Sequence, residues 1–119
     1  MRDRDDNVIV VKSKAFALRC IRLYRYLCEE KHEFVLSKQL LRSGTSIGAN
    51  VKEAIRAQSE ADFAAKMTIS LKEASESEYW LELLTESDYI TQTQSESILG
   101  DCRELIKILM SITKTVYKK

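Results

Sequence analysis

The sequence contains no proline and only three glycines in 119 residues. A protein built of tight turns and short strands depends on both residues, so this composition favours long helices. The only histidine, His32, lies in the polar segment Lys31-His32-Glu33, which we expect to be a loop. A single histidine excludes a di-iron centre built on Glu-x-x-His motifs and most nucleophile–base pairs. We therefore expect no enzymatic activity, no cofactor and no small-molecule substrate.

Cysteine and long apolar runs are also scarce. The three cysteines are an odd number and lack the spacing of a metal site, so we interpret them as reduced core residues rather than disulfide or zinc ligands: Cys20, Cys28 and Cys102. No apolar run approaches the roughly 20 residues that span a bilayer. The first seven residues include five charged ones, which is unlike a secretory signal peptide. These features predict a cytoplasmic protein without a membrane segment or a metal site.

Apolar residues recur at helical spacing in four segments, about 10–30, 36–57, 60–86 and 92–118. The last segment has the most regular row, which steps by four and three: Ile98, Cys102, Leu105, Leu109, Ile112 and Val116. Ser59 can cap the third helix, and Thr91 with Gln94 fits a capping box before the fourth. Short loops between amphipathic helices predict an all-α fold, an antiparallel up-down-up-down four-helix bundle, with residues 1–119 forming one domain.

The stretch from Arg42 to Ala54 is unusual for a helix because it includes Gly44 and Gly48. Each glycine inside a helix costs about 1 kcal/mol relative to alanine. The apolar residues around them nevertheless share one helical face: Leu40, Ile47, Val51 and Ala54. Because the two glycines are four residues apart, they lie together on the helix and allow another backbone to approach closely. We therefore predict close helix packing at Gly44 and Gly48.

A polar row lies beside that apolar face. If the second and third helices turn around near residues 58–59, then Arg42 faces Glu76 and Ser46 faces Lys72, because both helices rise equally per residue. An ion pair between Arg42 and Glu76 would fix the register of the two helices. The sequence thus predicts a structural polar network of six residues: Arg42, Ser46, Asn50, Glu53, Glu73 and Glu76.

Charge is unevenly distributed although the net charge is only +1. Residues 59–88 include eight acidic and two basic residues, whereas residues 8–31 include six basic and two acidic ones. Basic residues also align on the first and fourth helices, which are neighbours in the bundle, so the two rows can merge into one surface: Arg19, Arg22, Arg25, Arg103, Lys107, Lys114 and Lys118. This surface is either a solvated face, a site for RNA or DNA phosphates, or a site for an acidic protein surface.

Tyr79, Trp80 and Leu83 fall beside the apolar row of the third helix rather than within it. Aromatic residues and leucine next to an acidic helix are typical of a protein interface. The edge of a wide core is the alternative interpretation.

Two blocks of sequence resemble a known family. The first is Arg42, Ser46-Ile47, Asn50-Val51 and Glu53; the second is Lys72-Glu73-Ala74 with Glu76 and Tyr79-Trp80-Leu81. These blocks resemble the four-helix bundle proteins of the 23S rRNA intervening-sequence family, and the similarity extends from Val8 to Tyr117. A related branch is the accessory protein of diversity-generating retroelements, a pentameric bundle that binds the reverse transcriptase and nucleic acid. The resemblance therefore implies a bacterial bundle, a pentamer, with a scaffold or nucleic-acid-associated role.

The charge distribution also bears on assembly. A two-fold dimer with the third helix on its axis would oppose acid with acid, whereas a head-to-tail contact joins unlike faces and can close into a ring. The sequence thus favours a homo-oligomeric ring that acts as a non-enzymatic scaffold, with a nucleic-acid-binding accessory protein as the alternative. The number five comes from the resemblance alone.

Overall fold

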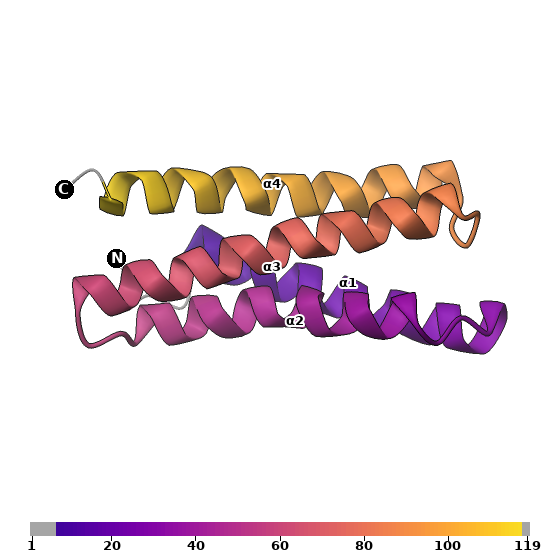
Figure 1. Cartoon of the computed structure of the whole chain (residues 1–119), viewed down its shortest axis with the longest axis horizontal. Coiled ribbons are helices and arrows are strands. Elements are labelled where there is room, and N and C mark those ends of the chain that lie inside the picture. The colour runs from indigo at the N-terminus through magenta and orange to yellow at the C-terminus, as the bar shows by residue number, and fades with distance from the viewer. Residues whose placement is uncertain (1–6, 118–119) are drawn as a thin grey trace.

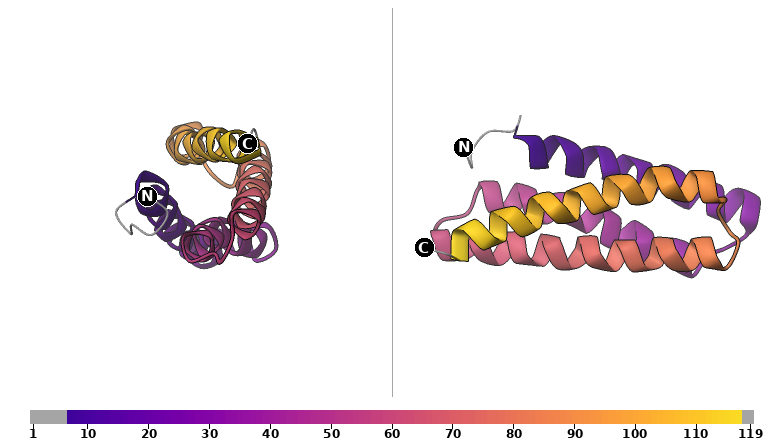
Figure 2. Two further views of the ribbon diagram at one scale, coloured as in Figure 1. Left: turned by 90° about the vertical axis from the view of Figure 1, so that its left-hand side faces the viewer. Right: turned by 90° about the horizontal axis from the view of Figure 1, so that it is seen from above.

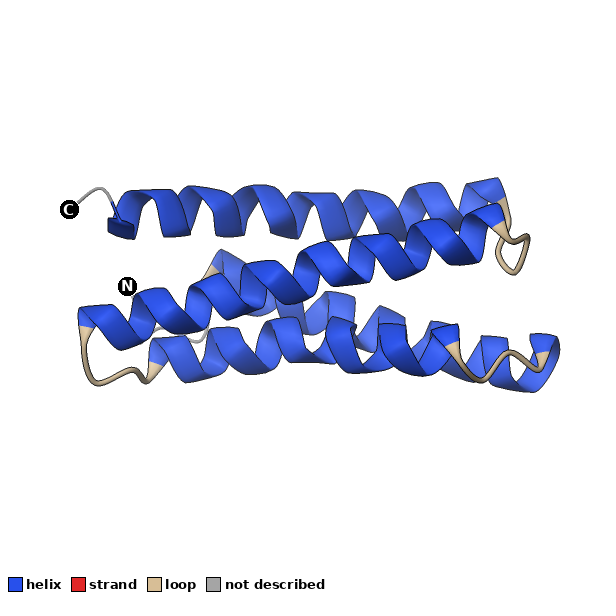
Figure 3. Ribbon diagram, in the orientation of Figure 1, coloured by secondary structure: helices blue, strands red, loops and turns tan. Residues whose placement is uncertain are grey.

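The computed structural model describes residues 7–117, and helices are the only regular elements in this range (Figure 3). The four helices are α1 (Val8–Lys31), α2 (Leu36–Ile55), α3 (Glu60–Glu86) and α4 (Gln92–Tyr117), joined by short loops (Figure 1). Each helix runs antiparallel to the one before it and packs beside it. The molecule is therefore a rod of about 45 × 22 × 21 Å.

The four helices surround a common axis, as the end-on view in Figure 2 shows. Helix α2 makes the two most extensive helix contacts, with α3 and with α1. Helix α1 also contacts α4, but this contact is the smallest of the four. The predicted antiparallel four-helix bundle is confirmed, and α2 is its most thoroughly packed member.

Capping residues set several helix ends. At α1, the Asn7 side chain accepts a hydrogen bond from the Ile9 N–H at 3.0 Å, so this helix begins before the expected start near residue 10. His32 ends α1 in the left-handed conformation with φ of 53°. The predicted caps of the later helices form as well: Ser59 accepts from the Asp62 N–H at 3.0 Å. Thr91 and Gln94 bond reciprocally at 2.8 and 3.1 Å.

Glu33, which was predicted only as part of a polar loop, caps helix α2. Its carboxylate accepts hydrogen bonds from the Leu36 and Ser37 N–H groups at 2.8 and 2.7 Å. Glu33 is buried, and its negative charge lies at the positive end of the helix dipole. At the other end, α2 stops at Ile55 rather than near residue 57, because Arg56 leaves the helical conformation.

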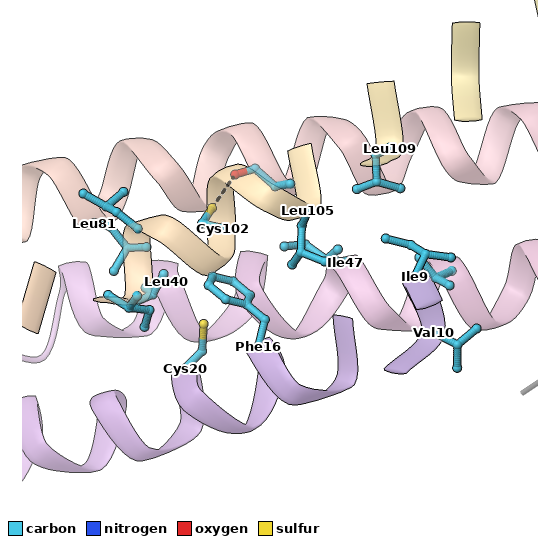
Figure 4. Close-up of a cluster of buried hydrophobic side chains, with 14 of the residues drawn as sticks. Ile9, Val10, Phe16, Cys20, Leu40, Ile47, Leu81, Cys102, Leu105 and Leu109 are labelled. Atoms are coloured by element: carbon cyan, nitrogen blue, oxygen red, sulfur yellow. Dashed lines mark hydrogen bonds between the residues drawn. The ribbon is translucent and has the colours of Figure 1, made fainter. Parts of the chain in front are cut away.

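The core runs the length of the bundle and draws side chains from all four helices, as Figure 4 shows for its central part. In that view Phe16 of α1, Ile47 of α2 and Leu105 of α4 point toward one another. The largest side chains that are almost completely buried include Ile9, Phe16, Leu27, Leu40, Ile47, Met67, Leu81, Leu84, Leu105 and Leu109. Cys102 also lies in this core, and its Sγ is 3.4 Å from the Ala74 carbonyl oxygen (Figure 4).

The two glycines of α2 both lie against α1, so α1 is the partner helix for the predicted close packing. A β-carbon at position 44 would overlap Cys20 Sγ and lie 3.1 Å from Cys20 Cβ. A β-carbon at position 48 would lie 3.4 Å from Ser13 Oγ and 3.5 Å from the Ser13 carbonyl oxygen. We call these contacts of Ser13 and Cys20 with Gly44 and Gly48 the glycine contact. Gly100 differs, because no atom lies within 4 Å of a β-carbon there.

This geometry predicts the effect of larger side chains. Gly44→Leu should lower the free energy of unfolding by about 1–3 kcal/mol, because the side chain would push α1 away from α2. Gly48→Leu should also be destabilising. Gly100→Leu is the matched control, and it should raise stability by up to about 1 kcal/mol because it only improves helix propensity. Urea denaturation followed by circular dichroism measures all three, and a Gly44→Leu variant as stable as the wild type would refute the close approach.

Candidate functional site

Buried serines join α2 to α3. Ser43 and Ser77 lie 2.8 Å apart, hydroxyl to hydroxyl, and Ser70 donates to the Ile47 carbonyl at 2.9 Å. Farther along, Lys66 forms an ion pair of 2.8 Å with Glu53. These contacts have the antiparallel register predicted for the two helices. These serines were not predicted as part of the polar network, although each occupies a core-facing position between apolar residues.

The predicted polar row on α2 bonds mainly within its own helix. Ser46 donates to the Arg42 carbonyl at 2.7 Å, and the Asn50 amide donates to the Ser46 carbonyl at 2.9 Å. The expected ion pair between Arg42 and Glu76 is absent from the contacts within residues 7–117, so this detail of the prediction is wrong. Arg42 is exposed, and an ion pair in solvent would contribute little against the entropy of holding a long side chain.

Glu73 is the most perturbed carboxyl of this region. Its Oε1 atom is shielded from solvent and lacks a hydrogen-bond partner within the described residues. Burial raises the pKa of Glu73, the neighbouring Glu76 raises it further, and the Arg42 guanidinium opposes both effects. Three of the six predicted network residues therefore interact here through charge: Arg42, Glu73 and Glu76.

Two arginines of the predicted basic surface form ion pairs between helices. Arg19 of α1 contacts Asp101 of α4 at 2.7 Å and also donates to Ser97 at 3.0 Å. Arg103 of α4 contacts two α3 carboxylates, Glu78 at 2.8 Å and Glu82 at 3.4 Å. Both guanidiniums thus link neighbouring helices.

The remaining basic residues are exposed: Arg22, Arg25, Lys107 and Lys114. Lys118 lies outside the described residues. The rows on α1 and α4 do not merge into an uninterrupted basic surface, because Asp101 and Glu104 of α4 lie where the two helices meet. Glu104 pairs there with Lys12 of α1 at 3.2 Å. The predicted merged basic surface does not form. Helical spacing shows which basic residues share a face of one helix, but it does not show which carboxylates of the neighbouring helix lie beside them.

The aromatic cluster on α3 divides between core and surface. Trp80 packs against the core, and its Nε1 is shielded from solvent without a hydrogen-bond partner in the described part of the chain. Tyr79 is exposed, and its ring lies 5.2 Å from the Trp80 ring at an interplanar angle of 59°. Leu83 is half-buried. Trp80 therefore fits the edge-of-core interpretation, whereas Tyr79 remains open to a partner.

Large apolar side chains are exposed on α1, on α3, on α4 and in the loop between α1 and α2, and pairs of them lie on α1 and on α3. On α1, Val11 is 54% and Leu18 is 46% exposed. On α3, Ile69 is 40% and Tyr79 is 53% exposed. Val11 and Leu18 are seven residues apart, which places them on one side of α1, and Ile69 and Tyr79 are ten residues apart on the outward half of α3. Such faces are typical of surfaces that contact another protein.

The cysteine thiols of the core contribute to packing and are poorly suited to act as nucleophiles. All three cysteines are free. Burial raises the pKa of Cys20 and of Cys102 to about 12, so both remain protonated thiols at neutral pH. Residues 7–117 contain no cluster of three or more metal-ligating side chains. None of the helices in this range is long and apolar enough to cross a membrane.

The fold and its close α1–α2 packing define the class of this protein as an antiparallel four-helix bundle. The model of the 23S rRNA-intervening sequence protein family matches residues 5–111, so the chain belongs to that family. The chain is also similar to a crystal structure of a protein with unknown function from the S23 ribosomal protein family of Bacteroides thetaiotaomicron. The two are 57% identical, with a TM-score of 0.90, and the match covers 96% of this chain and 99% of the other. No curated protein matches the chain.

The raised pKa of Glu73 predicts how the stability of the fold depends on pH. Because its pKa is raised in the folded chain, the folded state holds this proton more tightly than the unfolded state does. The resulting stability is complete below the ordinary glutamate pKa of about 4.3 and is lost as the pH rises through the raised value. Glu73→Gln should therefore gain stability relative to the wild type between pH 4 and pH 7.

Urea denaturation at the two pH values measures this gain. Glu86→Gln, an exposed residue on the same helix, is the control with the same change in charge. A stability difference between Glu73→Gln and the wild type that is constant with pH would contradict the raised pKa.

Proposed function

We propose that this chain is a non-enzymatic scaffold that assembles into a homo-oligomeric ring, a pentamer, in the bacterial cytoplasm. The observation that carries the proposal is the pair of exposed apolar faces, Val11 with Leu18 on α1 and Ile69 with Tyr79 on α3. Apolar area removed from water contributes about 25 cal/mol per Å², so burying such faces against another copy is favourable. The number five rests on the sequence resemblance to the pentameric accessory protein.

The chemistry of the side chains supports a structural role. The single histidine, His32, is exposed in a loop, where its ring centroid lies 6.4 Å from that of Phe34. The thiols of Cys20 and Cys102 lie in the core with raised pKa values. The buried hydroxyls, such as those of Ser43 and Ser77, are hydrogen-bonded to one another and to main-chain carbonyls.

Light scattering coupled to gel filtration tests the scaffold proposal. We expect wild-type protein at micromolar concentration to have the mass of a closed oligomer, five chains, that does not grow as the concentration rises. A mass that rises continuously with concentration would indicate an open filament rather than a ring. A monomer at micromolar concentration would refute the proposal.

Nucleic-acid binding is the second candidate function. It is supported by a hollow of about 250 Å³ between α1 and α4, lined by Arg22, Tyr26 and Gln94 among others. A guanidinium beside an aromatic ring suits a phosphate beside a stacked base. The exposed Arg25, three residues after Arg22 on α1, would add charge beside the hollow.

Gel retardation of RNA and single-stranded DNA at two salt concentrations tests this second function. Binding through phosphates weakens steeply as salt rises, with log K linear in log salt. Arg22→Gln should then weaken binding and reduce the slope, whereas Lys38→Gln, an exposed change on α2, should matter less. If micromolar protein retards neither nucleic acid at low salt, this second function is excluded.

A further inference from the structure

A groove runs along the outside of the bundle between α1 and α2. It has a volume of about 710 Å³, and we call it the outer groove. Small residues of α2 form its floor, including Thr45, Gly48 and Ala49, and apolar residues of α1 form its wall, including Val11 and Leu18. The glycine contact is therefore also the reason for the groove, because α1 sits close to a strip of α2 that lacks large side chains.

A surface that fills the outer groove must protrude and must be apolar. Helix α3 presents one in an outward row at steps of three and four, which we call the α3 face: Ile69, Lys72, Glu76, Tyr79, Leu83 and Glu86. Ile69 and Tyr79 are the exposed large apolar residues of this face. Helices α1 and α3 are not in contact with each other, so the groove and the α3 face lie on different sides of the molecule and stay free to meet another copy.

The charges of the two surfaces are complementary. Lys14 and Lys52 line the outer groove, and the α1 row that begins with Val11 and Leu18 continues into Arg22 and Arg25. The α3 face instead includes two glutamates, Glu76 and Glu86, and one lysine, Lys72, so it is acidic on balance. Because α1 and α3 run in the same direction, a parallel contact places Arg22 and Arg25, in the second half of α1, beside the acidic second half of α3. Groove against groove would oppose base with base.

We propose that the outer groove of one copy binds the α3 face of the next copy in a head-to-tail contact. This inference rests on the proposed homo-oligomeric scaffold and names its interface. The groove is shared between α1 and α2, so it does not point directly away from α3. Two different surfaces set at an angle generate a ring when copies are added in succession.

Two single substitutions break the contact from opposite sides. Leu18→Glu, the groove variant, places a carboxylate opposite the acidic α3 face. Tyr79→Lys, the face variant, places an ammonium group opposite the basic groove. Both residues are about half exposed, so both variants should remain helical and folded as judged by circular dichroism. Each should give the mass of a single chain where the wild type gives the oligomer.

Mixing the two variants distinguishes a head-to-tail contact from every symmetric one. The face variant keeps an intact groove, and the groove variant keeps an intact α3 face. An equimolar mixture should therefore form complexes that contain equal numbers of the two variants, detectable by native mass spectrometry. A mixture that remains monomeric would overturn the proposal, because no groove-to-face contact would then exist.

Met110→Glu is the matched control, since Met110 is equally exposed and apolar but lies on α4. It should leave the oligomer intact. Dissociation by this control, or an intact oligomer in both variants, would overturn the proposed interface while leaving the scaffold function standing. A monomeric wild type would instead refute the scaffold function itself.

Discussion

The approach of α1 to α2 at Gly44 and Gly48 is the constraint on which the rest of the bundle depends. Without a side chain at position 44, Cys20 fills the space and Phe16 reaches the common core beside it. The same approach leaves a shallow strip of small residues on the outside of α2, which becomes the outer groove. One packing feature thus determines both the interior of the molecule and an apolar groove on its surface.

Helix α2 packs against α1 and against α3 through two different kinds of contact. Toward α1 it presents glycines, which cost about 1 kcal/mol each in helix propensity and are compensated by close packing. Toward α3 it presents Ser43 and the Ile47 carbonyl, which bond to buried serines. Helix α4 is held differently at α1, where ion pairs of Lys12 and Arg19 join the smallest helix contact. Such partly exposed pairs contribute little individually.

Much of the fold could be predicted from the sequence because helical periodicity and capping are local properties. The regular row from Ile98 to Leu109 and the Thr91–Gln94 box are examples. The partners of long polar side chains could not be predicted in the same way. Arg19 and Arg103 each pair with a carboxylate of a neighbouring helix. Which carboxylate is within reach depends on the distances between the helices. Glu33 was missed because its role as a cap requires the chain to fold back over its side chain.

Native-state hydrogen exchange tests most directly whether the glycine contact is the constraint that organises the bundle. Amides open locally with free energies that reflect how well each element is packed. If the α1–α2 packing dominates, the central amides of α2 around Gly44 and Gly48 and those of α1 near Ser13 and Cys20 should exchange slowest. Amides of α4 should exchange faster. Slower exchange in α4 than in α2 would contradict this view and place the organising contact between α3 and α4.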